Sequence, residues 1–163
     1  MWTPKLETTA AQVVTYLNKL PETIATAESL TGGLLSGVLT SVPGASGCFQ
    51  GGVTSYATSI KAKILGVEPE LLETKGAVDP EVAKQMAQNV RELFCTDWAI
   101  STTGVAGPEP QDGKEVGTVY IAVANENQTY VKACSFTGSR AEIRYATVAA
   151  ALEYFQNIVA DDI

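Results

Sequence analysis

The segment ATAESLTGG, residues 25–33, places a serine between an apolar run and two glycines. The spacing predicts a buried strand followed by a helix that begins at Gly32, so Ser29 lies in the turn between them. The N–H groups and positive dipole end of such a helix can hold an anion, with Thr31, Gly32 and Gly33 nearest. Ser29 is therefore a candidate nucleophile above an oxyanion site. A helix cap formed by Ser29 or Thr31 is the alternative interpretation.

The chain contains no histidine, which excludes Ser-His-Asp and Cys-His catalysis. A serine nucleophile then needs another base, and a lysine whose pKa is lowered by burial can serve. Lys61 and Lys63 start a short predicted helix two positions apart, so only one of them should face the core. Spacing does not decide between them, and a solvated lysine is the alternative for either. Tyr56, at the end of the preceding predicted strand, can hydrogen-bond a serine or lysine and relay a proton.

A second group of residues suits an anionic ligand. Arg140 and Arg144 lie four positions apart at the start of the last predicted helix, where they share one face. Two guanidinium groups beside a helix N-terminus predict a phosphate or carboxylate site, and a charged helix face is the alternative. The loop that begins with Thr103 and Gly104 and includes Gly107 follows a predicted strand, which suits the rim of a pocket. Its glycine spacing matches neither a P-loop nor a dinucleotide fingerprint.

Apolar periodicity and turn residues predict that helices and strands interleave along the chain. Helices are expected over residues 5–20, 32–42, 61–65, 80–94 and 139–159, with a shorter one from residue 69. Strands are expected over residues 23–27, 49–56, 98–102, 117–124 and 129–136, and the last two form a hairpin. The fold class predicted from this order is α/β: a single three-layer α/β/α domain with a mixed sheet, covering residues 1–163.

Composition narrows the class of protein further. The net charge is −7, with 45% apolar and 18% charged residues, which is typical of a globular domain and argues against nucleic-acid binding. No apolar run approaches a membrane span and no signal peptide is evident at the start, so we expect a cytoplasmic protein without membrane contact. Three separated cysteines indicate neither a disulfide framework nor a zinc site, and no metal or cofactor is predicted. A homodimer is the default expectation for such a domain.

Five motifs of the chain resemble those of the CinA C-terminal-domain family, whose active members are nicotinamide mononucleotide deamidases. TAESLTGG resembles the family's TAESCTGG, and GGVTSYATSIKAKILGV resembles GGxVTYSNxxKxxLLGV. STTGVAGP is similar to SGIAGP, GKEVGTVYIAVA to KPVGTVxxA, and FTGSRAEIRYATVAAAL to FxGDRxxIRxxTxxxAL. The motifs occur in the same order and span nearly the whole chain, so the resemblance is specific.

The resemblance implies a metal-independent amidohydrolase that converts nicotinamide mononucleotide to nicotinic acid mononucleotide and ammonia. It implies Ser29 as the nucleophile, Lys61 as the base that spacing left undecided, and Tyr56 as an assisting group. Residues 103–107 and Arg140 would then bind the small-molecule nucleotide and its phosphate.

The chain also departs from the family motifs, at Leu30, Ser139 and Glu115, and it lacks the glycine pair that usually follows Pro108. Two other functions therefore remain open. One is a nucleotide-binding or assembly protein without turnover, for which the nucleotide would raise thermal stability and never be consumed. The other is a phosphohydrolase that holds magnesium near the glycine turn, which chelators would inhibit and which would release phosphate.

Overall fold

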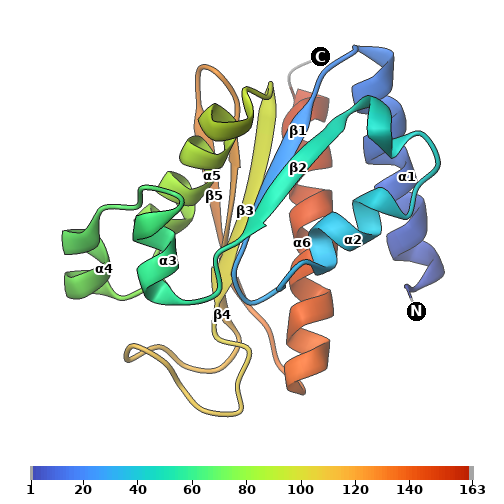
Figure 1. The fold of residues 1–163 in the computed structure, drawn as a ribbon. Coiled ribbons are helices and arrows are strands. Elements are labelled where there is room, and N and C mark those ends of the chain that lie inside the picture. The colour runs from blue at the N-terminus through green and yellow to red at the C-terminus, as the bar shows by residue number, and fades with distance from the viewer. Residues whose placement is uncertain (1, 162–163) are drawn as a thin grey trace.

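Five strands form one mixed sheet in the computed structural model, which describes residues 2–161. They are β1 (Ile24–Glu28), β2 (Phe49–Thr54), β3 (Trp98–Gly104), β4 (Thr118–Ala124) and β5 (Thr129–Ser135), in the spatial order β2-β1-β3-β4-β5. β1 pairs in parallel with both β2 and β3, and the remaining neighbours are antiparallel (Figure 1). The carboxyl ends of β1, β2 and β3 therefore meet at one end of the sheet.

Helices cover both faces of this sheet, which confirms the predicted three-layer arrangement (Figure 1). They are α1 (Pro4–Lys19), α2 (Leu34–Thr40), α3 (Thr58–Lys63), α4 (Pro69–Lys75), α5 (Pro80–Phe94) and α6 (Arg140–Asp161). α1, α2 and α6 pack together on one face, while α5 crosses the other face with α3 and α4 beside it. Residues 1, 162 and 163 of the predicted domain lie outside the described residues.

The sheet separates two apolar layers. The layer between the sheet and α1, α2 and α6 includes the fully buried Leu17, Leu39, Ile100, Leu152 and Phe155. The layer under α5 includes Ala25, Val82, Met86, Val90 and Ala99. β1 is buried along its whole length, as expected for a central strand that is covered on both faces. A side chain placed directly after β1 therefore rests on the most enclosed part of the sheet.

The predicted bounds differ from the structure mainly near the end of the sheet that carries the polar motifs. α2 begins at Leu34 rather than Gly32, because Gly32 and Gly33 have φ values of 56° and 103°, which a right-handed helix does not allow. β2 ends at Thr54, two residues earlier than predicted. β3 continues to Gly104, so the first residues of the predicted loop belong to the sheet.

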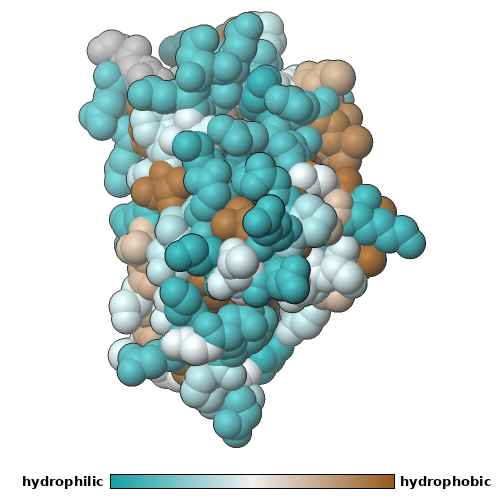
Figure 2. All heavy atoms as spheres, turned by 90° about the vertical axis from the view of Figure 1, so that its left-hand side faces the viewer, coloured by the Kyte–Doolittle hydropathy of each residue, from teal (hydrophilic) through white to brown (hydrophobic). Residues whose placement is uncertain are grey.

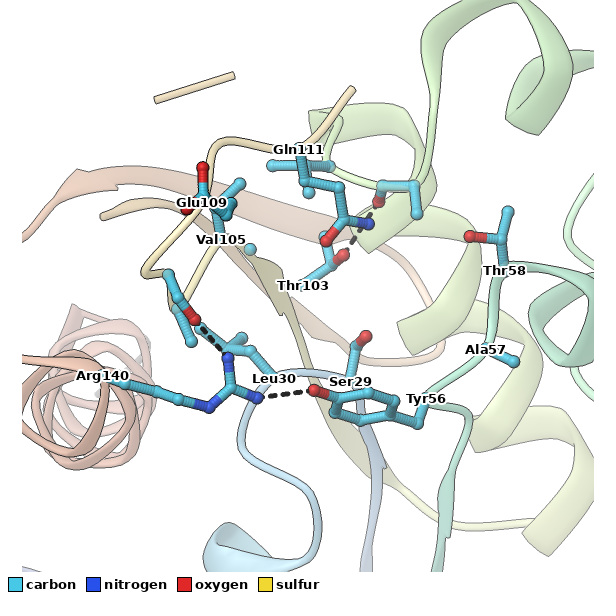
Figure 3. A pocket seen from close by; sticks show the side chains of 15 residues that line it. Ser29, Leu30, Tyr56, Ala57, Thr58, Thr103, Val105, Glu109, Gln111 and Arg140 are labelled. Atoms are coloured by element: carbon cyan, nitrogen blue, oxygen red, sulfur yellow. Dashed lines mark hydrogen bonds between the residues drawn. The ribbon is translucent and has the colours of Figure 1, made fainter. Parts of the chain in front are cut away.

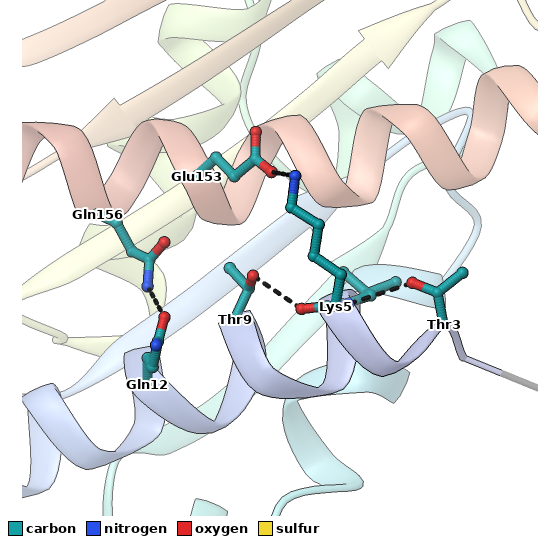
Figure 4. Close-up of polar contacts among 7 residues, drawn as sticks. Thr3, Lys5, Thr9, Gln12, Glu153 and Gln156 are labelled. Atoms are coloured by element: carbon teal, nitrogen blue, oxygen red, sulfur yellow. Dashed lines mark hydrogen bonds and ion pairs between the residues drawn. The ribbon is translucent and has the colours of Figure 1, made fainter.

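Polar contacts join α1 and α6 along their exposed sides. Lys5 Nζ lies 3.3 Å from the Glu153 carboxylate, and Gln156 donates to Gln12 at 2.8 Å (Figure 4). The face formed by α3, α4 and α5 is predominantly hydrophilic, with apolar residues scattered across it (Figure 2). Within residues 2–161, no helix has the length and apolar character needed to cross a lipid bilayer.

Candidate active site

Ser29 lies directly after β1, where the carboxyl ends of the parallel strands meet. Its backbone N–H donates to the Thr102 carbonyl at 3.0 Å, and its own carbonyl accepts from Gly32 at 2.9 Å, which fixes the turn. Ser29 is 8% exposed, so its hydroxyl is nearly enclosed by protein. Ligands of open α/β sheets bind beyond the carboxyl ends of parallel strands. The structure places Ser29 at such a position.

Lys61 lies on α3, in the connection that follows β2, and its side chain reaches Ser29. Its Nζ lies 2.9 Å from Ser29 Oγ, and it also donates to the carbonyls of Ser55 at 2.7 Å and Tyr56 at 3.2 Å. The Lys61 side chain is 1% exposed, whereas Lys63 is exposed. The structure therefore resolves the choice that spacing left open: Lys61 is the lysine beside Ser29.

Burial makes the neutral form of Lys61 more accessible than that of an exposed lysine. Burial lowers the pKa of Lys61 to about 8, and the charge of Asp112 opposes part of this effect. A neutral amine has two N–H donors and one lone pair. The structure records Nζ as the donor to Ser29 Oγ and to both carbonyls, which matches the three donors of the charged form. In the neutral form the two carbonyls can take both donors, so the lone pair is available to Ser29 Oγ. Neutral Lys61 can thus accept the proton of the Ser29 hydroxyl.

A cavity of about 290 Å³ opens beside this pair. Its lining includes six of the predicted site residues: Ser29, Tyr56, Thr103, Gly104, Gly107 and Arg140. Figure 3 shows the Ser29 hydroxyl pointing into the cavity, with Arg140 on one side and Thr58 on the other. Thr103 is buried, and its hydroxyl donates to the Ala77 carbonyl at 2.8 Å, so it fixes the cavity wall. A small polar ligand placed in this cavity would contact the Ser29 hydroxyl.

Arg140 spans one side of the cavity at the start of α6. Its guanidinium donates to the Tyr56 hydroxyl at 2.7 Å and to the Gly107 carbonyl (Figure 3). Among the described residues, the structure records no hydrogen bond from the Tyr56 hydroxyl to Ser29 or Lys61, and the hydroxyl accepts from Arg140, so the proton relay through Tyr56 stays a prediction. Tyr56 supports Lys61 through its backbone carbonyl. A guanidinium with further N–H groups beyond these two bonds remains suited to an anionic group of a ligand.

Besides Lys61, which lies behind Ser29, four predicted site residues are not part of the cavity lining: Thr31, Gly32, Gly33 and Arg144. Arg144 donates to the carbonyls of Leu30 at 2.8 Å and Thr31 at 3.3 Å, so it braces the turn after Ser29. The prediction that the two arginines converge on one anion is therefore wrong, because they bond to different loops. The Thr31 hydroxyl is buried against that of Thr102 at 2.8 Å.

The N-terminus of α2 is occupied by a carboxylate that the sequence motifs did not assign. Glu28 is 1% exposed, and it accepts from the backbone of Leu35 at 2.8 Å and Ser36 at 3.0 Å, and from the Ser36 hydroxyl at 2.7 Å. Glu28 therefore occupies two of the N–H groups at this helix end, and only those of the preceding turn remain for the predicted oxyanion site. Neither Ser29 nor Thr31 caps α2, so the alternative interpretation is wrong.

Comparisons with known proteins identify the family of this chain. The model of the CinA C-terminal domain matches residues 6–159. The chain belongs to the CinA family. A CinA-like protein of Frankia casuarinae is 46% identical over 138 residues, which are 85% of this chain and 32% of that protein. A putative competence-damage inducible protein of a Geobacillus strain is 49% identical over 142 residues, or 86% and 34%.

Solved structures of CinA proteins share this fold. The competence/damage inducible protein CihA of Agrobacterium tumefaciens superposes with a TM-score of 0.93 at 34% identity, covering 96% of this chain and 97% of that one. A CinA superfamily protein of Escherichia coli gives 0.91 at 30% identity, with coverages of 94% and 90%. This chain spans about a third of the length of the curated relatives that it matches.

One departure from the CinA motifs, Ser139, has a structural explanation. Ser139 precedes Arg140 where the motif has aspartate, and it forms a capping box with Glu142: each backbone N–H donates to the other side chain at 3.2 Å. These hydrogen bonds lower the pKa of Glu142. Ser139 thus caps α6 as expected.

In the loop after Pro108, Glu109 and Gln111 line the cavity, which no sequence signal indicated.

Proposed function

We propose that this chain is an amidohydrolase that converts nicotinamide mononucleotide to nicotinic acid mononucleotide and ammonia. The observation that carries the proposal is the 2.9 Å contact between Lys61 Nζ and Ser29 Oγ, made where burial brings the pKa of the amine to about 8. A general base needs a pKa near the working pH and direct contact with the proton it removes, and Lys61 meets both conditions. The competence-related names of the relatives do not specify a reaction.

The reaction divides into two halves, as for other serine nucleophiles. Ser29 Oγ bonds to the carboxamide carbon while its proton passes to Lys61 Nζ. The C–N bond then breaks, and ammonia leaves with the proton that Lys61 returns. In the second half, water attacks the resulting ester and gives its proton to Lys61, and the carboxylate product leaves as Ser29 regains a proton.

The surrounding residues would position the substrate for these steps. Arg140 would bind the phosphate, with Tyr56 holding the guanidinium in place. The backbone N–H of Leu30, which directly follows the nucleophile and has no acceptor within residues 2–161, is suited to hold the developing oxyanion. Residues 103–107 would form the wall against which the nucleotide lies.

The test is ammonia release from nicotinamide mononucleotide by the purified protein, with EDTA present. We expect Ser29→Ala and Lys61→Met each to lower kcat by about a thousandfold or more, because both groups act in the same proton transfer. Lys63→Met is the matched control, since it removes an exposed lysine two residues away and should leave kcat unchanged. Turnover that persists in Ser29→Ala would refute the proposal.

A nucleotide-binding protein without turnover is the second candidate. Glu109 favours it, because a carboxylate in the cavity wall stands where the family motif usually has glycines. For this function, nicotinamide mononucleotide would raise the melting temperature of the wild-type protein while ammonia release stays at the level of Ser29→Ala. Ammonia release well above that level would exclude it.

A further inference from the structure

The cavity beside Ser29 carries one positive and one negative side chain, Arg140 and Glu109. Figure 3 shows Glu109 on the side of the cavity away from Ser29, on the loop between β3 and β4. Within residues 2–161 the two charges do not form an ion pair, because the one ion pair there joins Lys5 and Glu153. The cavity therefore offers a ligand a positive and a negative group that do not neutralise each other.

The loop that carries Glu109 is fastened to the cavity wall on both sides of this residue. Before it, the Gly107 carbonyl accepts from the Arg140 guanidinium. After it, Asp112 Oδ2 accepts from the backbone N–H of Ala77 at 3.1 Å, and Ala77 lines the same cavity. Glu109 thus lies between two anchored points of the loop.

The backbone at Glu109 is also restricted by its neighbours in the sequence, Pro108 and Pro110. Each proline has a fixed φ, and a residue that precedes a proline is confined to extended conformations. An exposed charge usually gains little from a partner, because its side chain must be ordered to make the contact. A restricted and anchored backbone reduces the freedom that Glu109 has to lose. The carboxylate can therefore act on a ligand even though Glu109 is exposed.

The proposed substrate has charges of both signs, as the cavity has. Nicotinamide mononucleotide carries a positive charge on its pyridinium ring and a negative charge on its phosphate. The reaction requires the carboxamide at Ser29, so the ring that bears it must lie inside the cavity. The phosphate suits Arg140 and would be repelled by Glu109, since like charges repel. The group of the ligand that suits Glu109 is therefore the cationic ring.

We propose that Glu109 is a specificity-determining residue whose carboxylate selects ligands with a positively charged pyridine ring. The proposal rests on the proposed function, which places a nicotinamide nucleotide in this cavity. Glu109 directly follows Pro108, where the family motif usually has a glycine pair. The preference for a cationic ring would therefore be a property of this member and not of the fold.

Two ligands that differ in ring charge test the proposal. Reduced nicotinamide mononucleotide has a neutral dihydropyridine ring and keeps the same carboxamide, ribose and phosphate as the oxidised form. Isothermal titration calorimetry would give the Kd of both forms for Ser29→Ala, in which the carboxamide should stay intact. Glu109→Gln in this background removes the charge and keeps a side chain of similar size that can still accept a hydrogen bond. Glu115→Gln is the matched control, because it removes an exposed carboxylate of the same loop that does not line the cavity.

We expect Ser29→Ala to bind the oxidised form more tightly than the reduced form. Adding Glu109→Gln should weaken binding of the oxidised form by about three- to fivefold, the effect of a partly screened charge pair, and leave the reduced form unchanged. The difference should shrink at high salt, because salt screens exposed charges. Adding Glu115→Gln should change neither Kd.

The outcomes distinguish this proposal from the proposed function. Unchanged binding in Glu109→Gln, or equal weakening of both forms as for a contact with the ribose, would overturn the role of Glu109. Failure of Ser29→Ala to bind either form would overturn it too. Selective weakening of the oxidised form, with no ammonia released by the wild-type protein, would support the role of Glu109 and refute the amidase. Selective weakening together with ammonia release would support both.

Discussion

Lys61 is a fully buried lysine, and its contact with Ser29 is the one that a general base would make. The free energy that burial costs its charged form is the same free energy that lowers its pKa. The two carbonyls that accept from Lys61 compensate part of this cost. At the scale of the residue, the capacity for catalysis and the loss of stability have one physical origin.

This origin predicts a pH-dependent stability. The pKa of Lys61 is about 8 in the folded protein against 10.5 in the unfolded chain, so the unfolded state binds more protons between these values. The free energy of unfolding should therefore rise with pH across that window by roughly 3 kcal/mol relative to Lys61→Met. This gain in stability should be lost again as the pH falls to 8. Urea titrations of both proteins at several pH values measure it. Parallel curves would contradict the prediction.

Tyr56 and Arg140 should act as one unit, because the guanidinium donates to the hydroxyl. In a double-mutant cycle of Tyr56→Phe and Arg140→Ala, we expect losses of kcat/KM that are not additive, with a coupling energy of about 1 kcal/mol or more. If the hydroxyl instead serves Ser29 or Lys61 directly, the two losses would add. Steady-state kinetics on the four proteins decides between these results.

At the scale of elements, the turn from β1 into α2 depends on buried polar contacts. Glu28 caps α2, and Arg144 holds the carbonyls of the intervening turn from α6. Gly32 permits this arrangement, since a Cβ added there would lie 3.2 Å from the Arg144 guanidinium. The TAESLTGG segment thus contains two kinds of residues: Ser29, the proposed nucleophile, and the flanking acid and glycines, which set the geometry of the turn.

Glu28 should therefore matter far more for stability than an exposed acid. Glu28→Ala leaves buried N–H groups of α2 without an acceptor, and we expect the free energy of unfolding to fall by about 2–4 kcal/mol. Glu153→Ala is the control, because the Lys5–Glu153 pair is exposed and such pairs contribute less than about 1 kcal/mol. Chemical denaturation measures both. Equal losses would show that the Glu28 cap contributes little.

The sequence predicted the elements well but not all of their side-chain partners. Periodicity and turn residues were sufficient for the order of helices and strands, and the helix expected over residues 80–94 is α5 with the same bounds. Arg144 was misassigned because a shared helix face says nothing about which loop packs against it. Glu28 was missed because its partner, the start of α2, is set by tertiary packing. Lys61 was identified through the family resemblance, and the structure supplies its physical reason.

At the scale of the whole molecule, the cavity lies where three strand ends, α3, α6 and the β3–β4 loop meet. A ligand in the cavity should therefore stabilise the fold as a whole. At a hundredfold excess over Kd, nicotinamide mononucleotide should raise the free energy of unfolding of Ser29→Ala by about 2.7 kcal/mol. For a domain of this size, that corresponds to a rise in Tm of roughly 5–10 °C. Differential scanning fluorimetry measures it, and an unchanged Tm would contradict binding at this site.

The way in which Lys61 is held has a consequence for how this site can change over evolutionary time. Its two fixed hydrogen-bond partners are main-chain oxygens, which exist whatever amino acids occupy positions 55 and 56. These contacts of Lys61 therefore do not depend on the side chains at positions 55 and 56. Changes at the two positions are open to evolution, and to an engineer, at no direct cost to those hydrogen bonds.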